Sequence, residues 1–189
     1  MKTTLSIIGL FFVLCLHAQV KPPELDKSPM DMSYWPMNYP VLKMNGKAKD
    51  MPVARVIYSR PFKNGRTIYG NLIEYGKVWR MGANEATEIE FFSDVRIGGK
   101  LIPKGRYTMY YIVYENKWTI IINSDDYMWG HFKYNPAKDI VRKDIAVEKI
   151  PDTVEAFTMY FEETNTGANL VITWDNLKGS LPIILAGDN

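Results

Sequence analysis

The chain has 189 residues and a formal net charge of +2, with both signs interspersed along its length. Nucleic-acid-binding proteins carry clustered basic faces, which this distribution of charges does not predict. The lysines also form no runs of the kind that bind membrane surfaces. We therefore expect binding neither to nucleic acid nor to a membrane surface. Aromatic residues make up 13% of the chain. This surplus suits strands, cores and flat binding surfaces.

The first residues have the pattern of a secretory signal peptide. Lys2 supplies a positive start, Leu5 to Leu16 is apolar, and Ala18 is a small residue suited to cleavage before Gln19. The apolar stretch falls short of the ~20 residues of a membrane-spanning helix, and no later segment reaches that length. We therefore expect residues 1–18 to be removed and the protein to be exported, periplasmic or extracellular, without spanning a membrane.

Cys15 is the only cysteine, and it offers lipid anchoring as an alternative. Lipoprotein signals place small residues just before the modified cysteine, whereas Phe12, Val13 and Leu14 stand here. We favour cleavage without a lipid. The mature chain then contains no disulfide, no thiol nucleophile and no thiolate metal ligand.

Residues 19–50 form a segment rich in proline and methionine. Prolines at this density are incompatible with a helix and break a central strand, so we expect an extended arm. Met32, Tyr34, Trp35 and Tyr39 make this arm too apolar for a free linker, which predicts that Ser33–Val41 docks on the domain. The prolines of the arm are Pro22, Pro23, Pro29, Pro36 and Pro40.

From residue 51 onward the chain carries short strand signals separated by turn residues. Residues 87–91 alternate strictly, which places Ile89 and Phe91 inward and two glutamates outward. Gly98-Gly99 is a hairpin signal, and Pro136 favours one helical turn. Further turns are expected at 103–105, 115–116 and 165–167, and further strands at 54–58, 106–114, 117–122, 140–147, 154–161, 169–174 and 180–185.

This pattern of about nine or ten short strands, without helical periodicity, predicts an all-β fold. We expect residues 51–189 to form a single antiparallel β-sandwich, jelly-roll-like or immunoglobulin-like, to which the N-terminal arm is attached. Its core is expected to contain Val56, Ile89, Phe91, Met109, Trp118, Ile120, Phe157, Leu170 and Ile172.

A run of glycines, arginines and aromatic residues near the middle of the chain resembles a bacterial family known as domain of unknown function 2911. The resemblance covers about residues 29–185 and implies an exported bacterial domain, but it brings no assigned catalytic residues. Its most specific segments are Tyr58-Ser59-Arg60-Pro61, Gly65 to Gly70 and Gly76 to Thr87, followed by Lys104-Gly105-Arg106-Tyr107, Trp118-Thr119, Trp129-Gly130, and Tyr134 leading to Lys138-Asp139 and Arg142.

Arg60, Arg66 and Arg80 lie in loops that we expect at the same end of the sandwich. Three guanidiniums there would bind a carboxylate or phosphate, because their planar forks donate two parallel hydrogen bonds. The alternative is structural. Each arginine would then fasten loops together by pairing with a local acid, the candidates being Glu74, Glu85 and Asp139.

Asn84-Glu85 follows Gly82-Ala83 in a segment that suits a tight loop with positive φ at the asparagine. Glu85 would serve as a general base if a second group such as Asp139 lay near it in the fold. Otherwise Asn84 and Glu85 have a structural role and hold the loop in its conformation.

Trp129-Gly130-His131 begins a third candidate segment, which ends at Tyr134. An exposed Trp129 and Tyr134 would stack on sugar rings or peptide side chains, whereas a buried Trp129 would support a long connection. His131 is the only histidine of the mature chain, so a histidine-rich metal site is excluded. Asp125-Asp126 lacks the spacing of a calcium loop, and we expect no metal and no cofactor.

We therefore expect a non-catalytic binding or envelope-interaction module, whose partner is a small molecule, a glycan or an envelope protein. The alternative is a metal-independent hydrolase that acts on a glycan or peptide with Glu85 and Asp139 as acid and base. A third possibility is a structural assembly role. The expected ligand-binding residues are Arg60, Arg66, Arg80, Asn84, Glu85, Trp129, Tyr134 and Asp139.

Overall fold

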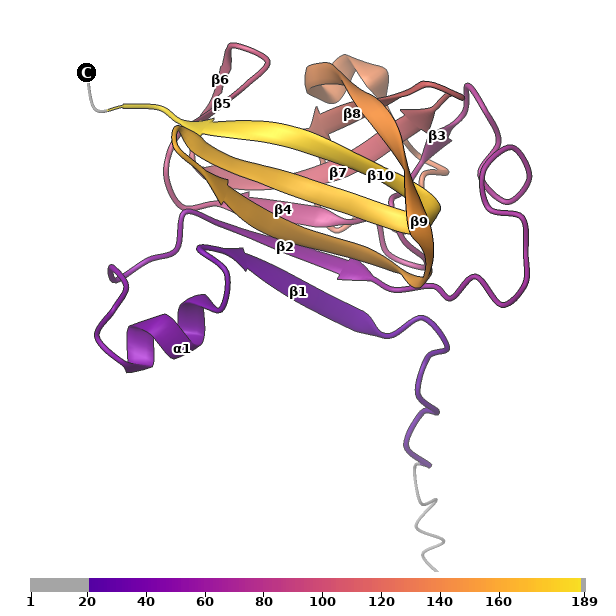
Figure 1. The fold of residues 1–189 in the computed structure, drawn as a ribbon, viewed down its shortest axis with the longest axis horizontal. Helices are drawn as coiled ribbons and strands as arrows, with labels where there is room; N and C mark the ends of the chain where they lie inside the picture. Colours follow the sequence, from indigo (N-terminus) through magenta and orange to yellow (C-terminus); the bar gives the residue numbers. More distant parts are fainter. Residues whose placement is uncertain (1–20, 188–189) are drawn as a thin grey trace, which may run out of the picture.

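The computed structural model describes residues 21–187, and Figure 1 shows their arrangement. The expected signal peptide, its cleavage site and Cys15 lie outside the described residues. The strands are β1 (Met30–Trp35), β2 (Ala54–Ser59), β3 (Val78–Trp79), β4 (Glu88–Phe91), β5 (Val95–Ile97), β6 (Lys100–Ile102), β7 (Gly105–Val113), β8 (Lys117–Asn123), β9 (Asp139–Thr164) and β10 (Gly167–Leu185); the helices are α1 (Tyr39–Met44) and the short 3-10 helix η1 (Pro136–Lys138).

All strand pairs are antiparallel, and the strands follow one another in the order β1-β2-β4-β7-β8-β9-β10-β5-β6, with β3 paired to β7. The sheet does not close, because β1 and β6 are its two edges. It folds over on itself as a sandwich, which confirms the predicted all-β class (Figure 1).

The two layers are joined by β9, which pairs with a different neighbour in each half. Residues 139–146 of β9 pair with β8, and residues 147–164 pair with β10. The core lies between the layers, and the predicted core is confirmed. The residues exposed by no more than 1% include Val56, Ile89, Phe91, Met109, Trp118, Ile120, Phe157, Leu170 and Ile172.

The predicted turns are also confirmed. Gly98 and Gly99 connect β5 to β6 with φ of 59° and 83°, a left-handed pair that glycine adopts without a steric penalty. Residues 165–166 join β9 to β10, and η1 supplies the helical turn expected after Pro136.

The last strands are longer than predicted. The two expected strands at 140–147 and 154–161 are both parts of β9, and those at 169–174 and 180–185 are both parts of β10. The register between these strands shifts around Asp175, whose φ is 55°. Such a bulge bends a strand without ending it. The sequence therefore suggests two separate strands where the structure has one continuous strand.

The arm lies against the domain, but not as extended chain throughout. β1 pairs along β2, and Trp35 and Tyr39 are buried. The prediction that its prolines exclude a helix was wrong, because α1 begins at Tyr39 with Pro40 in its first turn. Proline is tolerated there, since the amide groups of a first turn have no partner within the helix.

Candidate functional site

A loop of residues 124–135 covers the side of β7 and β8 that faces away from the sandwich core. Residues alternate along β7, so Tyr111 and Val113 belong to the core while Tyr110 and Ile112 form a second apolar cluster with Ala86 and Ile121. Met128 and Tyr134 of the loop pack on this cluster. The loop is therefore anchored because it buries the apolar side chains beneath it.

The backbone of this loop is also tied to residues 84–88. Glu85 and Trp129 form an isolated antiparallel bridge. The amide of Gly130 donates to the Asn84 carbonyl oxygen at 2.8 Å, and that of Ala86 donates to the carbonyl of Met128 at 2.8 Å. Asn84 has the expected positive φ, 59°. These contacts bring Asn84, Glu85 and Trp129 together.

Three aromatic side chains of the loop point into solvent. Tyr127, Trp129 and Phe132 are exposed by 76%, 60% and 78%, and we refer to these three as the aromatic loop surface. Arg106 restrains one of them, because Nη1 donates to the Tyr127 hydroxyl at 2.8 Å and the guanidinium lies 5.2 Å from the ring centroid. A hollow of about 240 Å³ lies alongside, lined in part by Tyr127 and Glu85.

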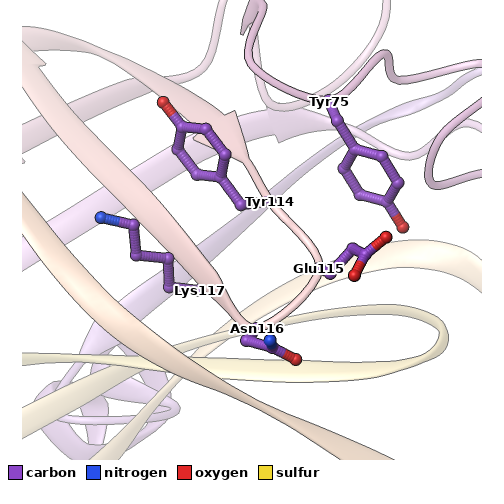
Figure 2. A pocket seen from close by; sticks show the side chains of 5 residues that line it. All are labelled: Tyr75, Tyr114, Glu115, Asn116 and Lys117. Carbon is purple, nitrogen blue, oxygen red and sulfur yellow. The ribbon is translucent and has the colours of Figure 1, made fainter.

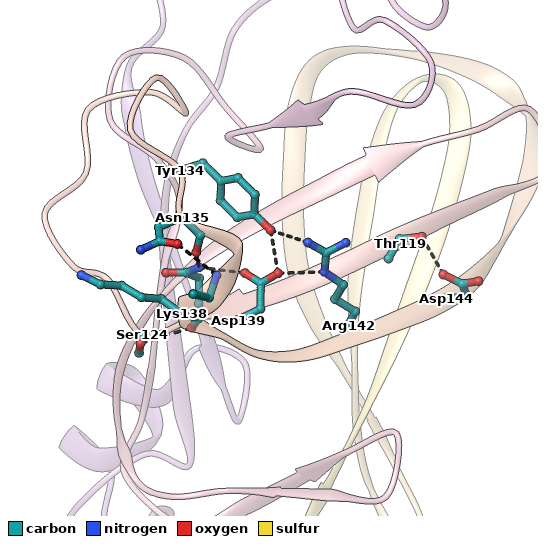
Figure 3. Close-up of polar contacts among 10 residues, drawn as sticks. Thr119, Ser124, Tyr134, Asn135, Lys138, Asp139, Arg142 and Asp144 are labelled. Atoms are coloured by element: carbon teal, nitrogen blue, oxygen red, sulfur yellow. Dashed lines mark hydrogen bonds and ion pairs between the residues drawn. The ribbon is translucent and has the colours of Figure 1, made fainter.

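Asp139 is occupied by a polar network at the base of the loop, as Figure 3 shows. One of its oxygens accepts from Asn123 Nδ2 at 2.8 Å, and the other accepts from the Tyr134 hydroxyl at 2.6 Å and from Arg142 Nε at 2.7 Å. Burial, followed by the bond to Asp139, raises the pKa of Tyr134 to about 12. Tyr134 and Asp139 thus fasten the loop to the start of β9.

Arg60 connects three parts of the chain. Its Nη1 donates to Asp31 of β1 at 3.0 Å, its Nη2 to Thr158 Oγ1 at 2.8 Å and its Nε to the carbonyl of Phe157 at 3.2 Å. The acid that it pairs with is therefore Asp31, on the arm, and none of the acids proposed from the sequence. This geometry makes Arg60 a tie between β1, β2 and β9.

We expect the change of Arg60→Met to lower the free energy of unfolding by about 1–2 kcal/mol, because it leaves Asp31 and a β9 carbonyl without their donor in a pair that is about one-third exposed. Urea denaturation measures this loss. The matched control is Arg66→Met, expected to cost less than about 0.5 kcal/mol because that side chain is exposed. Equal losses in the two variants would contradict the role of Arg60.

Arg66 bonds within its own turn, where Nε donates to the carbonyl of Lys63 at 3.0 Å and Nη2 donates to that of Phe62. The hydrogen bonds and ion pairs within residues 21–187 link Arg66 to neither Arg60 nor Arg80. That these three arginines share one ligand stays a prediction, and the described contacts give each of them separate surroundings.

The loop that carries Arg80 is held by Ser59, which the sequence marks only as part of a motif. The buried Ser59 hydroxyl accepts from the amide of Ala83 and donates to its carbonyl, both at 2.5 Å. A Cβ on Gly82 would lie 2.8 Å from that hydroxyl. The need for glycine beside a serine explains two members of the motif structurally.

Arg80 itself has no carboxylate partner within the described chain. Its guanidinium lies 5.2 Å from the ring centroid of Trp79, and its buried Nε lacks a hydrogen-bond partner among these residues. Burial lowers the pKa of Arg80. Arg80 therefore differs from Arg60 and Arg66, both of which are satisfied by protein oxygens.

A hollow that no sequence pattern indicated lies between Tyr75 and Tyr114 (Figure 2). It measures about 460 Å³ and is also lined by Glu115, Asn116 and Lys117 at the turn between β7 and β8. The Nζ atom of Lys117 lies 5.4 Å from the ring centroid of Tyr114. The same atom forms an ion pair with Asp144 Oδ2 at 2.6 Å. The two tyrosines are far apart in sequence, so no local pattern signals their approach.

No group of three or more histidine, cysteine, aspartate or glutamate side chains within residues 21–187 is placed to hold a metal ion. In the same part of the chain, no helix has both the length and the apolar character needed to cross a membrane.

Comparison with known proteins identifies one family. The model of the family described as "Protein of unknown function (DUF2911)" matches residues 42–183, which includes the motifs from Tyr58 to Arg142 and leaves β1 outside. No curated protein and no solved structure matches the chain.

Proposed function

The chain belongs to the DUF2911 family, and from the geometry of its loops we propose that it is an exported, non-catalytic module that binds a glycan. The binding surface is the aromatic loop surface, flanked by Asn84 and Glu85. A glycan fits this surface because the faces of sugar rings are apolar and pack on aromatic rings, while their hydroxyl groups bond to amide and carboxylate side chains.

The observation that carries the proposal is the combination of exposed aromatic rings with a fixed backbone. Tyr127, Trp129 and Phe132 lie within six consecutive residues of one loop, and the loop is hydrogen-bonded to residues 84–88 and to β9. Flat side chains on an ordered loop lose little conformational entropy on binding. The favourable free energy of contact with a ligand is therefore not offset by the cost of ordering the loop. Glu85 is exposed beside them.

Tryptophan fluorescence offers a direct test, because four of the five tryptophans are buried and Trp129 is 60% exposed. We expect acrylamide to quench Trp129 selectively in the free protein. Oligosaccharides such as chitohexaose and cellohexaose, screened by thermal shift, should include one that protects Trp129 from quenching and raises the melting temperature. At 100 times its dissociation constant, a ligand adds about 2.7 kcal/mol of stability.

The controls separate stacking from general stabilisation. Phe132→Ala should weaken protection of Trp129 by the same sugar without lowering the melting temperature of the free protein. Tyr114→Ala, in the other aromatic hollow, should leave that protection unchanged. If no sugar protects Trp129 while peptides or organic acids do, the glycan is the wrong ligand class.

Export is part of the same proposal and rests on the pattern of Lys2, Leu5 to Leu16 and Ala18. We expect mass spectrometry of protein from expressing cells to show an N-terminus at Gln19 and no lipid. Acylation of Cys15 would replace this part of the proposal with membrane anchoring.

The hydrolase alternative has less support from the geometry. A carboxyl pair acting as acid and base needs both groups free to exchange protons with a substrate. Glu85 is exposed, but the side chain of Asp139 is 8% exposed and both of its oxygens accept hydrogen bonds from the protein. Asp139 is better suited to fixing the loop than to transferring protons.

A further inference from the structure

The hollow of about 240 Å³ beside the aromatic loop surface is lined by residues from separate parts of the chain. Met30 comes from β1, Ile57 from β2, Glu85 and Glu88 from the segment that leads into β4, and Tyr127 from the loop. We call it the Met30 hollow, because the arm reaches it through that residue. Since Tyr127 belongs to both, a ligand that extends past this ring on the aromatic loop surface enters the Met30 hollow.

The position of the Met30 hollow follows from the alternation of side chains along the strands. Val56 belongs to the core, so its neighbour Ile57 points away from the core. Ile57 lies opposite Glu88 of β4 and opposite Met32 of β1, and Met30 lies two residues from Met32 on the same side of its strand. The outer side of three adjacent strands therefore supplies one wall of the hollow (Figure 1).

The walls of the Met30 hollow are mostly apolar. Met30, Ile57, Ala86 and Met128 all line it. A ligand reaches it from solvent, because Met30 is 52% exposed and Tyr127, at the rim, is 76% exposed. Apolar walls favour a methyl group, since removing its surface from water is favourable.

One of the two glutamates in the hollow is available to a ligand. Glu88 is occupied, because its Oε1 accepts from the amide of Tyr127 at 3.0 Å and its Oε2 lies 3.7 Å from Arg106 Nη1. Glu85 is exposed and belongs to none of the ion pairs within residues 21–187. An ionised carboxylate accepts hydrogen bonds and donates none, so the matching group of a ligand carries an N–H or O–H.

Resting on the glycan binding proposed above, we propose that the Met30 hollow receives the acetamido group of an N-acetylated amino sugar. The methyl group contacts Met30, Ile57 and Met128, the N–H donates to Glu85, and the carbonyl oxygen faces water at the open side. The hollow has room for this group of a few non-hydrogen atoms, since one water molecule takes about 30 Å³ of liquid volume.

Two related sugars fit the Met30 hollow less well. A hydroxyl group in place of the acetamido group bonds to Glu85 but leaves the apolar walls without a methyl group to contact. An ammonium group pairs with Glu85 but loses its hydration against those walls, which is unfavourable. The amide of Ala86 donates to the carbonyl of Met128 at 2.8 Å. This bond fixes the walls before a ligand binds, so little ordering opposes binding.

Three hexasaccharides with the same linkage test the proposal, because they differ in the group at carbon 2 of each sugar. Chitohexaose carries acetamido groups, cellohexaose hydroxyl groups and the glucosamine hexamer ammonium groups. Affinities are measured through the protection of Trp129 from acrylamide. We expect chitohexaose to bind at least about tenfold more tightly than cellohexaose, the effect of one hydrogen bond to a charged group, and also more tightly than the glucosamine hexamer.

The outcomes separate this proposal from glycan binding in general. Equal affinities for chitohexaose and cellohexaose would overturn the acetamido site and leave glycan binding standing. Tightest binding of the glucosamine hexamer would also overturn it, in favour of an ammonium group. If none of the three protects Trp129, the acetamido site is wrong, and the other sugars of the thermal-shift screen decide separately whether a glycan binds.

Variants of the lining residues test the geometry. Met30→Ala should reduce the preference for chitohexaose over cellohexaose, whereas Met32→Ala should retain it, because Met32 lies on the same strand, is 51% exposed and does not line the hollow. Glu85→Ala should weaken chitohexaose binding about tenfold or more, and Glu85→Gln, which keeps an acceptor oxygen, should restore part of it. Glu115→Ala, an exposed glutamate in the other hollow, should bind chitohexaose as the original chain does.

Nuclear magnetic resonance of the methionine methyl groups locates the bound sugar directly. The chain has ten methionines, and the variants Met30→Ala and Met128→Leu assign the two signals of interest. We expect nuclear Overhauser effects from the acetyl methyl groups of chitohexaose to the Met30 and Met128 methyl groups, and none to Met44, which is 78% exposed on α1. Binding of chitohexaose without these effects would overturn the site, whatever the affinities.

Discussion

The change of Trp118→Ala is expected to lower the free energy of unfolding by about 3–5 kcal/mol, the range for removing a large aromatic side chain from a core. Trp118 is fully buried in β8. Its ring stacks on Tyr69, with centroids 5.4 Å apart, and meets the edge of Tyr111 at 5.5 Å. Alanine leaves a cavity between the layers, because β8 is hydrogen-bonded on both sides and cannot move in to fill it.

Urea denaturation followed by circular dichroism measures this loss, and an unchanged m-value would show that both variants unfold from the same native state. The matched control is Trp129→Ala, which removes an equally large side chain that is 60% exposed. It should change stability by less than about 0.5 kcal/mol, as substitutions at exposed positions do. A similar loss at both positions would mean that Trp118 is not a core residue in solution.

The core and the turns were predictable from the sequence because both are local signals. Strict alternation at Ile89 and Phe91 fixes which side of β4 faces inward, and burial of one face enforces that register. Gly98-Gly99 specifies a two-residue hairpin through its backbone preferences alone. Neither inference needed any knowledge of distant residues.

Strand length and the arm helix were harder to predict. The interruption near Asp175 looks like the end of a strand, but pairing with β9 on either side of the bulge holds the chain in β10. Tertiary pairing here outweighs local propensity. In α1, the position of Pro40 rather than its presence decides whether a helix forms. The sequence does not mark where the first turn of that helix begins.

The candidate site was predictable in its residue types and only partly in its contacts. The bridge between Glu85 and Trp129 unites two segments that the sequence marked separately. The partner of Arg60 is Asp31, far away in the chain, and acids closer in sequence do not take that role. Which arginine lacks a partner depends on how three loops pack, so the distinction between Arg60 and Arg80 is a property of the fold. Whether these residues bind a ligand stays a prediction.

Gly179 provides the second large effect, since its place against Trp118 leaves no room for a side chain. A Cβ at this position would lie 2.6 Å and 2.8 Å from two ring carbons of Trp118 and 3.0 Å from the end of Ile145. The backbone of Gly179 lies outside the left-handed region, so alanine is excluded by packing and not by φ. We expect Gly179→Ala to cost about 1–3 kcal/mol, as overpacking of a core does.

The two predictions are coupled, and a double-mutant cycle tests them together. In a chain that already carries Trp118→Ala, the added methyl group at residue 179 enters the space that the indole has left. Gly179→Ala should then cost little or even stabilise, which gives a coupling energy of about 1–3 kcal/mol, within the range for residues in contact. Gly99→Ala is the control, because a methyl group there meets no atom within 4 Å, and its effect should be the same in both backgrounds to within about 0.5 kcal/mol. If the effects of Gly179→Ala and Trp118→Ala simply add, the indole does not pack against Gly179, and the close contact between β8 and β10 at the centre of the sandwich is absent in solution.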